Sequence, residues 1–555
     1  MRPASPLSEA LMRAFEARAA AEQIVFRSRS GARQAYRGTD LSSMAGEMAQ
    51  TLKLWLGSAP CRIVVALPAG PDFVTLLLGG VLAGVTVVPV PVPRHGSHTE
   101  RFRHIVADSR ASAVICLPEH AGIITAELTR HGPASCPVVP LPLNPAHLPE
   151  PARAAGDTAR LAVIQYTSGS TRFPKGVAIT GDNILANVGL VARSWGLGPS
   201  SRFVNWLPHY HDMGLMGGIL TPLLCGGFSA QMGPLDFIRK PALWPEAVSA
   251  ERATISGGPA FAFAECVQRV TADQIAGMDL STWSRAFCGA EPVPAELPEQ
   301  FHAHFAPAGL SRAAVFACYG MAEMTLFASG KPGPSRAAPA AAKSMAPCII
   351  PGEQRDRIAI VSPETTRPAA PGKVGEIWLR GASKGQGYIG LPDESAAQFE
   401  ASLDGERGWL RTGDLGLVEG DALYVVGRLR DVLICKGRKI SAPEIEWLAC
   451  KMSPALNPMA AAAFMPDQNR GGHAVLIVET RMGACLPEAD ALAETLRRTV
   501  RGEWALELDE VRFVPRGRLP RTSSGKVRRA AAAEMWRQGA FDTAQQMAEV
   551  PSCPS

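Results

Sequence analysis

The sequence predicts an α/β protein: a large N-terminal domain of layered, mostly parallel sheets with helices plus a β-rich subdomain, and a small α+β C-terminal domain. In the first half, short apolar runs rich in Val and Ile alternate with segments of helical length, which is typical of a parallel sheet covered by helices. Beyond residue 357 the apolar runs are bounded by Gly and Pro and favour antiparallel strands. They shorten near residue 430, so we expect domains at 1–429 and 430–540 and a disordered tail at 541–555.

The composition of the 555 residues allows a large buried core, because 46% are hydrophobic and only 19% are charged. A disordered chain has the opposite balance, so bulk disorder is excluded. The net charge of +5 is mild for this length and does not by itself indicate a nucleic-acid-binding protein. None of the twelve cysteines forms a CxxC pair and many lie in apolar runs, which predicts buried thiols in a reducing, cytoplasmic compartment.

Each element in the first part of the chain follows from its apolar pattern. An amphipathic helix is expected at 7–21, and further helices at 72–83, 101–109 and 180–195, the last with Asp182 as its N-cap. Strands are expected at 62–67, 85–88, 113–116 and 161–165. The uncharged stretch 73–93 is long enough to span a membrane, but its glycines and terminal prolines favour a buried helix, a turn and a buried strand. We therefore expect no membrane span.

The rest of the chain continues the alternation and then changes character. Further strands are expected at 203–207, 254–256, 286–288, 357–361, 375–380 and 422–426. The proline-rich residues 137–151 predict a surface connection. The low-complexity segment GKPGPSRAAPAAAKSMA at 330–346 predicts a mobile loop or an insertion.

The strongest signal for chemistry is the sequence YTSGSTRFPKGV at 166–177, directly after a predicted buried strand. Small residues let the backbone approach phosphate oxygens, hydroxyl and N–H groups donate hydrogen bonds, and the Arg and Lys neutralise charge. The loop lacks the GxxxxGK spacing of a P-loop NTPase. We therefore expect a phosphate-binding loop of another kind.

This loop resembles the phosphate-binding loop of the adenylate-forming superfamily, which includes acyl-CoA synthetases, peptide-synthetase adenylation domains and fatty acyl-AMP ligases. Further motifs follow in the family's order: GAEP at 289–292, YGMAE at 319–323, TGD at 412–414, GRLRD at 427–431 and PRTSSGKVRR at 520–529. Each motif is weak alone, but their order is very specific. Arg172, PVPVPR at 89–94, WLPHYHDMGLMGGIL at 206–220 and CGAEPV at 288–293 resemble the fatty acyl-AMP ligases most.

The resemblance implies that a fatty acid of medium or long chain reacts with ATP, with Mg²⁺ as cofactor, to give acyl-AMP and pyrophosphate. The acyl group then passes to the phosphopantetheine thiol of a separate acyl carrier protein. The implied nucleotide-binding residues are Thr167, Ser168, Gly169, Ser170, Thr171, Arg172, Lys175, Gly289, Ala290, Glu291, Tyr319, Gly320, Met321, Ala322, Asp414 and Arg428.

The resemblance also implies catalytic roles for Lys526, Glu323 and His211. Lys526 would reach the α-phosphate and the carboxylate from the small mobile α+β C-terminal domain, which acts as a lid. Glu323 would hold Mg²⁺, and Asp414 would accept the ribose hydroxyls. His211 would stand at the entrance of the acid pocket, with Asp212 orienting its ring.

Several alternatives stay open at this point. The acceptor could be CoA, which would make the protein a fatty acyl-CoA ligase, or the chain could be a non-catalytic nucleotide- or acyl-binding module. Gly214, Gly217 and Gly218 either border an acyl tunnel or serve helix packing. The basic cluster at 512–529 is either a solvated charge run or a docking surface for an acidic carrier protein. We do not expect nucleic acid, because aromatic residues hardly interleave with these cations.

Overall fold

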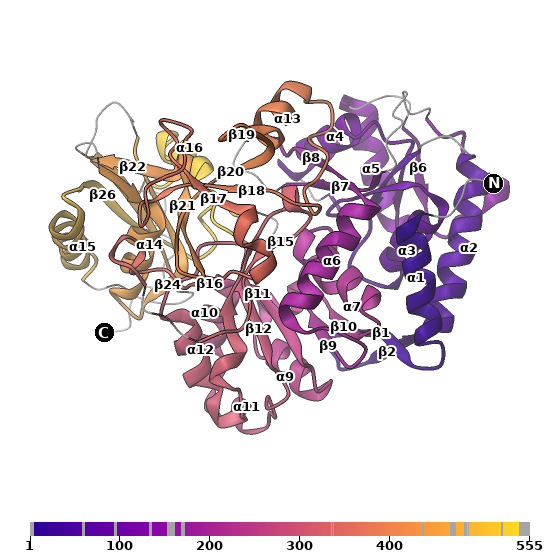
Figure 1. Ribbon diagram of the computed structural model, residues 1–555, viewed down its shortest axis with the longest axis horizontal. Coiled ribbons are helices and arrows are strands. Elements are labelled where there is room, and N and C mark those ends of the chain that lie inside the picture. Colours follow the sequence, from indigo (N-terminus) through magenta and orange to yellow (C-terminus); the bar gives the residue numbers. More distant parts are fainter. Residues whose placement is uncertain are drawn as a thin grey trace.

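The protein, seen here in a computed structural model, is an α/β molecule with two mostly parallel sheets, an antiparallel sheet and a smaller C-terminal part (Figure 1). The structure describes residues 5–57, 61–93, 97–131, 136–152, 161–167, 173–334, 336, 338–435, 438–466, 473–481, 486, 488–522 and 525–542. Of the expected disordered tail at 541–555, only Phe541 and Asp542 lie within this range, and Phe541 is buried in an apolar cluster, so the tail begins later than predicted.

The first sheet has seven strands in the order β13-β12-β11-β9-β10-β1-β2, and only the β1–β2 pair is antiparallel. Its strands are β1 Glu22–Arg27, β2 Arg33–Arg37, β9 Arg202–Asn205, β10 Phe228–Met232, β11 Ile255–Pro259, β12 Arg285–Gly289 and β13 Val315–Ala317. The strands predicted at 203–207, 254–256 and 286–288 are confirmed as β9, β11 and β12 with shifted ends.

The second sheet has six strands in the order β6-β5-β3-β4-β7-β8, and only the β7–β8 pair is antiparallel. Its strands are β3 Arg62–Ala66, β4 Thr86–Pro89, β5 Ala113–Cys116, β6 Val138–Pro140, β7 Leu161–Tyr166 and β8 Gly176–Thr180. The four strands predicted here are confirmed. The stretch 137–151 is not a connection throughout, because β6 pairs with β5 at its start.

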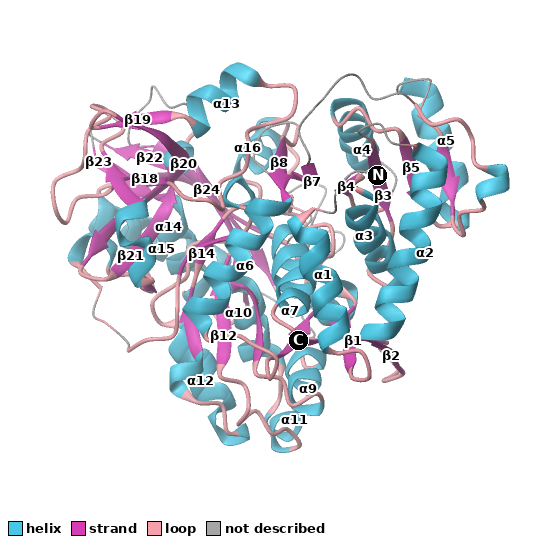
Figure 2. Cartoon of the chain, turned by 45° about the vertical axis from the view of Figure 1, so that its right-hand side comes forward, coloured by secondary structure: helices cyan, strands magenta, loops and turns pink. Residues whose placement is uncertain are grey.

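Helices cover these sheets, and the largest apolar core joins both sheets to them (Figure 2). The helices of this part are α1 Pro6–Ala17, α2 Gly38–Leu56, α3 Pro71–Ala83, α4 Ser97–Asp108, α5 Pro118–His131, α6 Gly181–Trp195, α7 Thr221–Leu224, α8 Pro234–Arg239, α9 Leu243–Ala250, α10 Ala260–Arg269, α11 Ala272–Ala276, α12 Leu297–Phe305 and α13 Pro392–Phe399. None of the described helices is long and apolar enough to cross a membrane.

The N-cap of α6 is Thr180, so the prediction of Asp182 is wrong. The Thr180 hydroxyl oxygen accepts the Asn183 N–H at 3.2 Å, and the Asn183 amide oxygen accepts the Thr180 N–H at 3.0 Å. This reciprocal pair satisfies two backbone donors at the helix start, which a carboxylate at Asp182, already inside the first turn, does not do.

The β-rich part is an antiparallel sheet of order β16-β21-β20-β18-β17, with β19 paired to β20. Its strands are β16 Cys348–Ile349, β17 Ile358–Val361, β18 Gly375–Leu379, β19 Ala401–Leu403, β20 Glu406–Glu419 and β21 Ala422–Arg428. The prediction that 330–346 is a mobile loop or insertion is wrong for its second half. Ala342 and Met345 are fully buried against Leu417 and Tyr424 of this sheet.

The C-terminal part has sheets and an apolar core of its own. Strands β22 Val432–Cys435 and β23 Arg438–Ser441 form a hairpin, and β24 Leu456–Phe464, β25 His473–Thr480 and β26 Glu507–Val514 form a mixed sheet. The helices here are α14 Ala442–Lys451, α15 Ala489–Trp504 and α16 Arg529–Arg537. These elements lie together at the left of Figure 1. The ten described cysteines of the whole chain are free thiols, and most are buried.

Candidate active site

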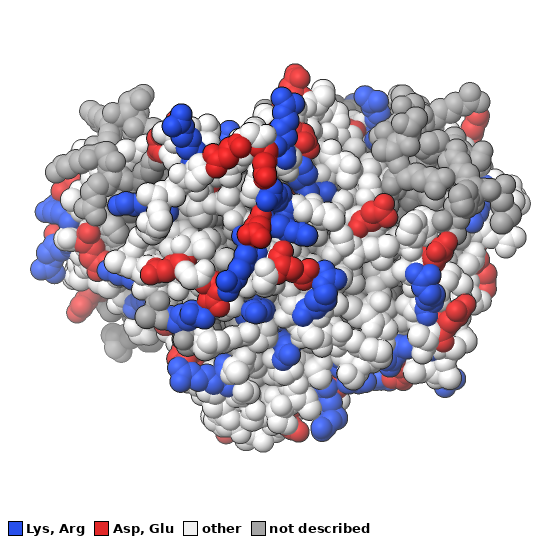
Figure 3. All heavy atoms as spheres, in the orientation of Figure 1, with Lys and Arg blue, Asp and Glu red and all other residues white. Residues whose placement is uncertain are grey.

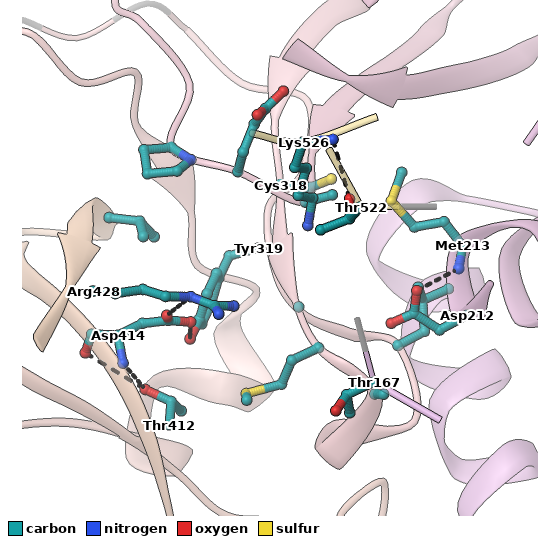
Figure 4. A pocket seen from close by; sticks show the side chains of 18 of the residues that line it. Thr167, Asp212, Met213, Cys318, Tyr319, Thr412, Asp414, Arg428, Thr522 and Lys526 are labelled. Atoms are coloured by element: carbon teal, nitrogen blue, oxygen red, sulfur yellow. Dashed lines mark hydrogen bonds and ion pairs between the residues drawn. The ribbon is translucent and has the colours of Figure 1, made fainter. Parts of the chain in front are cut away.

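A cavity of about 580 Å³ lies where the large part of the chain meets the C-terminal part. Its walls come from segments far apart in the sequence, including Thr167 after β7, Tyr319, Asp414 in β20 and Lys526 (Figure 4). Loops at the carboxyl ends of parallel strands are the usual place for ligand sites in open α/β sheets. We refer to this space as the central cavity.

The loop after β12 brings backbone and side chain together at the cavity wall. Ala290 has a φ of +66°, a left-handed conformation that is uncommon outside glycine. A Cβ at Gly289 would lie 2.6 Å from the carbonyl oxygen of Cys318, so only glycine fits between the neighbouring strands. The next residue, Glu291, is thereby turned into the cavity, where it accepts the N–H of Phe261 at 3.0 Å.

Asp414 is held from two sides by residues of the sequence motifs. Its Oδ2 accepts the Tyr319 hydroxyl at 2.8 Å, and its Oδ1 lies 3.1 Å from Nε of Arg428. Arg428 stands directly opposite in the β20–β21 register, so the antiparallel pairing itself brings the two side chains together. The Asp414 carboxylate raises the pKa of Arg428, while burial and then this carboxylate raise the pKa of Tyr319. Both partners therefore stay protonated and keep donating to Asp414.

Glu323 is a buried carboxyl on the short 3₁₀ turn Ala322–Met324. Its Oε1 accepts the Tyr388 hydroxyl at 2.8 Å. Burial raises the pKa of Glu323, although this hydrogen bond partly opposes the shift. A buried carboxyl that faces a polar cavity can gain from a hard cation, because Mg²⁺ prefers oxygen ligands and compensates for the lost hydration.

Lys526 reaches the central cavity from the C-terminal part. Its loop is closed by two hydrogen bonds with Thr522, one to the Thr522 hydroxyl at 3.1 Å and one from the Thr522 N–H at 2.8 Å. Burial and then the neighbouring Arg428 lower the pKa of Lys526, whereas Glu291 and Asp212 oppose this. Conversely, burial raises the pKa of Glu291 and Lys526 opposes it, so the two groups lie within electrostatic reach of each other.

His211 and Asp212 lie at the cavity wall as predicted, with Nδ1 of His211 2.5 Å from Oδ1 of Asp212. Burial disfavours the ionised form of Asp212, but the His211 ring and other partners outweigh this and lower the pKa of Asp212. The same carboxylate accepts the Met213 N–H at 2.8 Å, at the start of a π-helix over Met213–Leu220. Asp212 therefore lies where it can orient the His211 ring, the role that the resemblance implies.

The three glycines of this π-helix were expected either to border an acyl tunnel or to serve helix packing, and the structure separates them. A Cβ at Gly214 would lie 2.1 Å from the carbonyl oxygen of Pro208, and one at Gly218 would lie 2.2 Å from the Asn205 side chain. Both therefore serve packing. Gly217 lines the cavity, where a Cβ would lie 3.2 Å from the side chain of Leu326.

One end of the central cavity is apolar. Its lining includes Val191, Trp195, Phe203, Phe287, Leu326 and Phe327, which pack together in one apolar cluster. The Trp195 and Phe287 rings stack with centroids 5.2 Å apart, and Nε1 of Trp195 donates to the Gly330 carbonyl oxygen at 2.8 Å. This end can take a hydrocarbon group, whereas the end around Asp414, Arg428 and Lys526 can take a polar, anionic one.

The structure brings together most of the predicted site residues. Those that line the central cavity are Thr167, Lys175, His211, Ala290, Glu291, Tyr319, Gly320, Met321, Ala322, Glu323, Asp414, Arg428 and Lys526. Lys175 is ion-paired with Glu394, and its Nζ lies 5.0 Å from the centroid of the Tyr388 ring. Gly289 only shapes the wall, and Ser168, Gly169, Ser170, Thr171 and Arg172 lie outside the described residues.

The sequence analysis did not identify Tyr388, whose hydroxyl donates a hydrogen bond to Glu323. The only sequence signal for it is an aromatic residue between glycines in GQGYIG at 385–390. The aromatic end of the cavity was missed as well, since Trp195 and Phe287 have helix and strand patterns typical of core residues.

The basic cluster at 512–529 is largely neutralised within the chain. Arg512 pairs with Glu510 and Asp542, Arg516 with Glu265, Arg521 with Glu479, and Arg529 with Asp431 and Glu446. Charged side chains of both signs are intermixed on the described face in Figure 3. At Arg512, Arg516, Arg521 and Arg529 the cluster is therefore paired within the chain and not freely solvated.

Comparisons with known proteins point in the same direction as this geometry. Residues 12–389 match the AMP-binding enzyme family. The medium-chain-fatty-acid–acyl-carrier-protein ligase JamA of Moorena producens is 32% identical over 526 residues, which cover 88% of each chain. A long-chain-fatty-acid–AMP ligase of Mycobacterium marinum is 32% identical over 516 residues, which cover 87% of this chain and 88% of the relative.

Solved structures of related proteins have a similar fold over nearly the whole length of this chain. A structure from a study of fatty acyl-adenylate ligases of E. coli and L. pneumophila has a TM-score of 0.81 at 27% identity and covers 97% of this chain and 98% of its own. A fatty acyl-adenylate ligase of L. pneumophila in complex with acyl adenylate and pyrophosphate has a TM-score of 0.68, again at 27% identity, with 97% and 96% covered. With a family match over more than half its length and relatives of this identity, the chain belongs to the AMP-binding enzyme family and lies close to the fatty acyl-AMP ligases within it.

Proposed function

We propose that this protein activates a medium- or long-chain fatty acid with ATP to acyl-AMP and pyrophosphate, and then transfers the acyl group to the phosphopantetheine thiol of an acyl carrier protein. The observation that carries the proposal is one cavity with Lys526, Glu323 and Asp414 at a polar end and aromatic residues at an apolar end. The names of the related acyl-carrier-protein and fatty-acid–AMP ligases support the same reaction.

In this proposal, the nucleotide occupies the polar end. Asp414 has lone pairs left beyond those used by Tyr319 and Arg428, and they accept the ribose hydroxyls. The adenine lies against the wall formed by 289–291 and 319–322. Thr167 and Lys175, with the loop 168–172 between them, bind the β- and γ-phosphates.

In the first half-reaction, a carboxylate oxygen of the fatty acid attacks the α-phosphorus, and the bond from that phosphorus to the bridging β-phosphate oxygen breaks as pyrophosphate leaves. The acid is already ionised at neutral pH, so no general base is needed. Lys526 neutralises the charge that gathers where the two anions meet. Glu323 would hold a Mg²⁺ ion, which supplies charge neutralisation of the phosphate oxygens.

In the second half-reaction, the thiol loses its proton to solvent as its sulfur attacks the acyl carbonyl carbon, the carbonyl carbon–oxygen bond to AMP breaks, and AMP leaves. His211 lines the cavity, and we assign it to the entrance of the acid pocket, held by Asp212. We also propose that residues 1–429 and 430–540 are the two domains, and that the second is a lid carrying Lys526.

Two other functions remain as outcomes of the test. An acyl-CoA ligase shares the first half-reaction and differs only in the acceptor. A non-catalytic nucleotide- or acyl-binding module would bind the same ligands without turnover.

The product assay separates these functions. The protein is incubated with ATP, Mg²⁺ and acids of short, medium and long chain, with holo-carrier protein or CoA as acceptor, and the products are identified by mass spectrometry. We expect acid-dependent pyrophosphate release and acyl-carrier formation much faster than acyl-CoA formation. Efficient acyl-CoA formation without carrier loading would assign the chain to the CoA ligases, and no pyrophosphate with any acid would favour the binding module.

The Lys526→Ala variant tests the catalytic assignment at the residue level. It should lose adenylation by about 10²–10³-fold, as do other preorganised electrostatic groups, while ATP still binds, with a much smaller loss of affinity. Near-normal turnover in this variant would contradict the role of Lys526.

A further inference from the structure

Helix α10 of the large part contacts the C-terminal part close to Lys526, whose motif at 520–529 is called the lysine loop below. A Cβ at Gly525, the residue before Lys526, would lie 2.9 Å from the Phe261 ring, so the loop is in direct contact with this ring. The N–H of Phe261 donates to Glu291, which lies in the cavity within reach of Lys526. One helical turn later, Glu265 lies 3.3 Å from Nη2 of Arg516 in the C-terminal part.

Arg516 is connected to Lys526 through a buried clamp. The Glu479 carboxylate, which is fully buried, accepts the N–H groups of Gly517 and Leu519 on Oε1 and lies 3.0 Å from Arg521 on Oε2. Arg521 in turn donates to the Gly525 carbonyl oxygen at 2.9 Å. These bonds tie Gly517 and Leu519 directly, and Gly525 through Arg521, to one carboxylate, so we expect a shift of Arg516 to move Lys526 with it.

Glu265 is well placed to fix this clamp. Its side chain is only 11% exposed, and its carboxylate lies between Arg516 and Arg269, the latter at 3.0 Å on the same helix. An ion pair shielded from water in this way is screened less by salt than a surface pair. A second ion pair across the same interface joins Lys451, at the end of α14, to Glu296; its side chains are about half exposed, and neither residue bonds to Glu479 in the described structure.

We propose that Glu265 and Arg516 are a positioning pair that seats the lysine loop on α10 and thereby sets Lys526 in its place for adenylation. Neither side chain lines the central cavity, so neither acts on the substrates directly. The proposal rests on the adenylation function proposed above. It assigns the pair to the first half-reaction alone, because only that step needs Lys526 at the meeting point of the two anions.

The first test compares Arg516→Gln, Arg516→Lys and Glu265→Gln with the control Lys451→Gln. The two Gln variants of the pair should lower kcat for acid-dependent pyrophosphate release by about tenfold or more, since small misplacement of a catalytic group has effects of this size. Arg516→Lys, which keeps the charge, should recover most of this loss, and Lys451→Gln should stay near the wild type. KM for ATP and the transfer of an acyl group from supplied acyl-AMP to holo-carrier should be unchanged.

The second test measures how firmly the lysine loop is held against α10 and needs no enzymatic activity. Hydrogen exchange of the unliganded protein should become faster in the peptides that cover 517–528 and α10 in Arg516→Gln, and not in Lys451→Gln. This result stands even if the wild type releases no pyrophosphate, so failure of the proposed function and failure of the positioning pair are told apart. Unchanged exchange and unchanged kcat would overturn the proposal, and so would an equal loss of adenylation and transfer, which indicates a general structural role.

Discussion

The Lys526 ammonium lies in surroundings that work against its charge. Burial and Arg428 lower its pKa, and the carboxylates of Glu291, Asp212 and Asp414 offset this only in part. In the absence of ATP, the protein therefore holds this proton more weakly than an ordinary lysine does. Bound phosphates add negative charge beside it and favour the protonated form, so substrate binding and protonation of Lys526 support each other.

This residue gives a prediction for the pH dependence of adenylation. The rate depends on protonated Lys526, so kcat/KM for ATP should be full below the lowered pKa and fall as pH rises through it, below the usual lysine value of about 10.4. The alkaline limb of kcat should lie at higher pH, because kcat reports the complex with bound phosphates. Steady-state rates across neutral and alkaline pH measure both limbs.

The control for this prediction is Lys526→Arg, because arginine keeps its proton throughout the range. Whatever activity the variant retains should lack the alkaline limb in kcat/KM. If the limb persists unchanged, another group titrates there and Lys526 is not its source.

Among single residues, the sequence allows prediction of those site residues that lie inside a compact motif. Glu323, Asp414 and Lys526 each sit in a compact motif and are brought to one cavity. Tyr388 could not be found in this way, because its hydrogen bond to Glu323 joins residues that are 65 positions apart. Spacing along the chain carries no information on such a partner until the fold is known.

The backbone approaches itself very closely in the short β14–β15 pair, Tyr319–Gly320 with Phe327–Ser329, beside the polar end of the central cavity. A Cβ at Gly320 would lie 1.8 Å from the Leu326 carbonyl oxygen, which no side chain rotation relieves. Gly320→Ala should therefore lower the free energy of unfolding by about 1–3 kcal/mol through overpacking, and raise KM for ATP because the neighbouring Tyr319 is displaced from Asp414. Denaturant unfolding and steady-state kinetics measure the two effects.

A matched glycine substitution separates this effect from the loss of glycine in general. Gly46 is exposed within α2, and a Cβ there would meet nothing within 4 Å. Gly46→Ala should raise the free energy of unfolding by about 0.5–1 kcal/mol, since alanine loses less entropy in a helix. An equal change in the free energy of unfolding in the two variants would show that the close approach at Gly320 does not make alanine destabilising there.

The sequence allows prediction of helices and strands wherever apolar residues recur with a clear period. It does not allow prediction of where these elements end or of which residues pack around them. The buried strands β3, β5 and β12 follow from their Val-, Ile- or Ala-rich runs, but β2 was missed because its residues are mostly exposed. The composition of 330–346 favours a loop, yet tertiary packing buries Ala342 and Met345. Likewise, the charge run at 512–529 has a solvated composition, and only the fold supplies the carboxylates that neutralise it.

At the scale of the whole molecule, the central cavity joins segments from Thr167 to Lys526, so a ligand that fills it links the large part to the C-terminal part. A non-hydrolysable acyl-AMP analogue at 100 times its Kd should raise the free energy of unfolding by about 2.7 kcal/mol. It should also make the two parts unfold together, because the analogue contacts both. Unfolding curves from tryptophan fluorescence and from hydrogen exchange of 430–540 measure the shift and the coincidence.

Comparison with AMP and with Lys526→Ala makes this last prediction specific. AMP fills only the polar end, so at equal concentration it should stabilise the protein less than the acyl analogue, which also buries its hydrocarbon chain against Trp195 and Phe287. In Lys526→Ala the analogue should bind more weakly and the unfolding of the C-terminal part should separate from the rest. An unchanged, coincident transition in that variant would mean that the C-terminal part is held by contacts other than Lys526, with the Glu265–Arg516 pair as the first to examine.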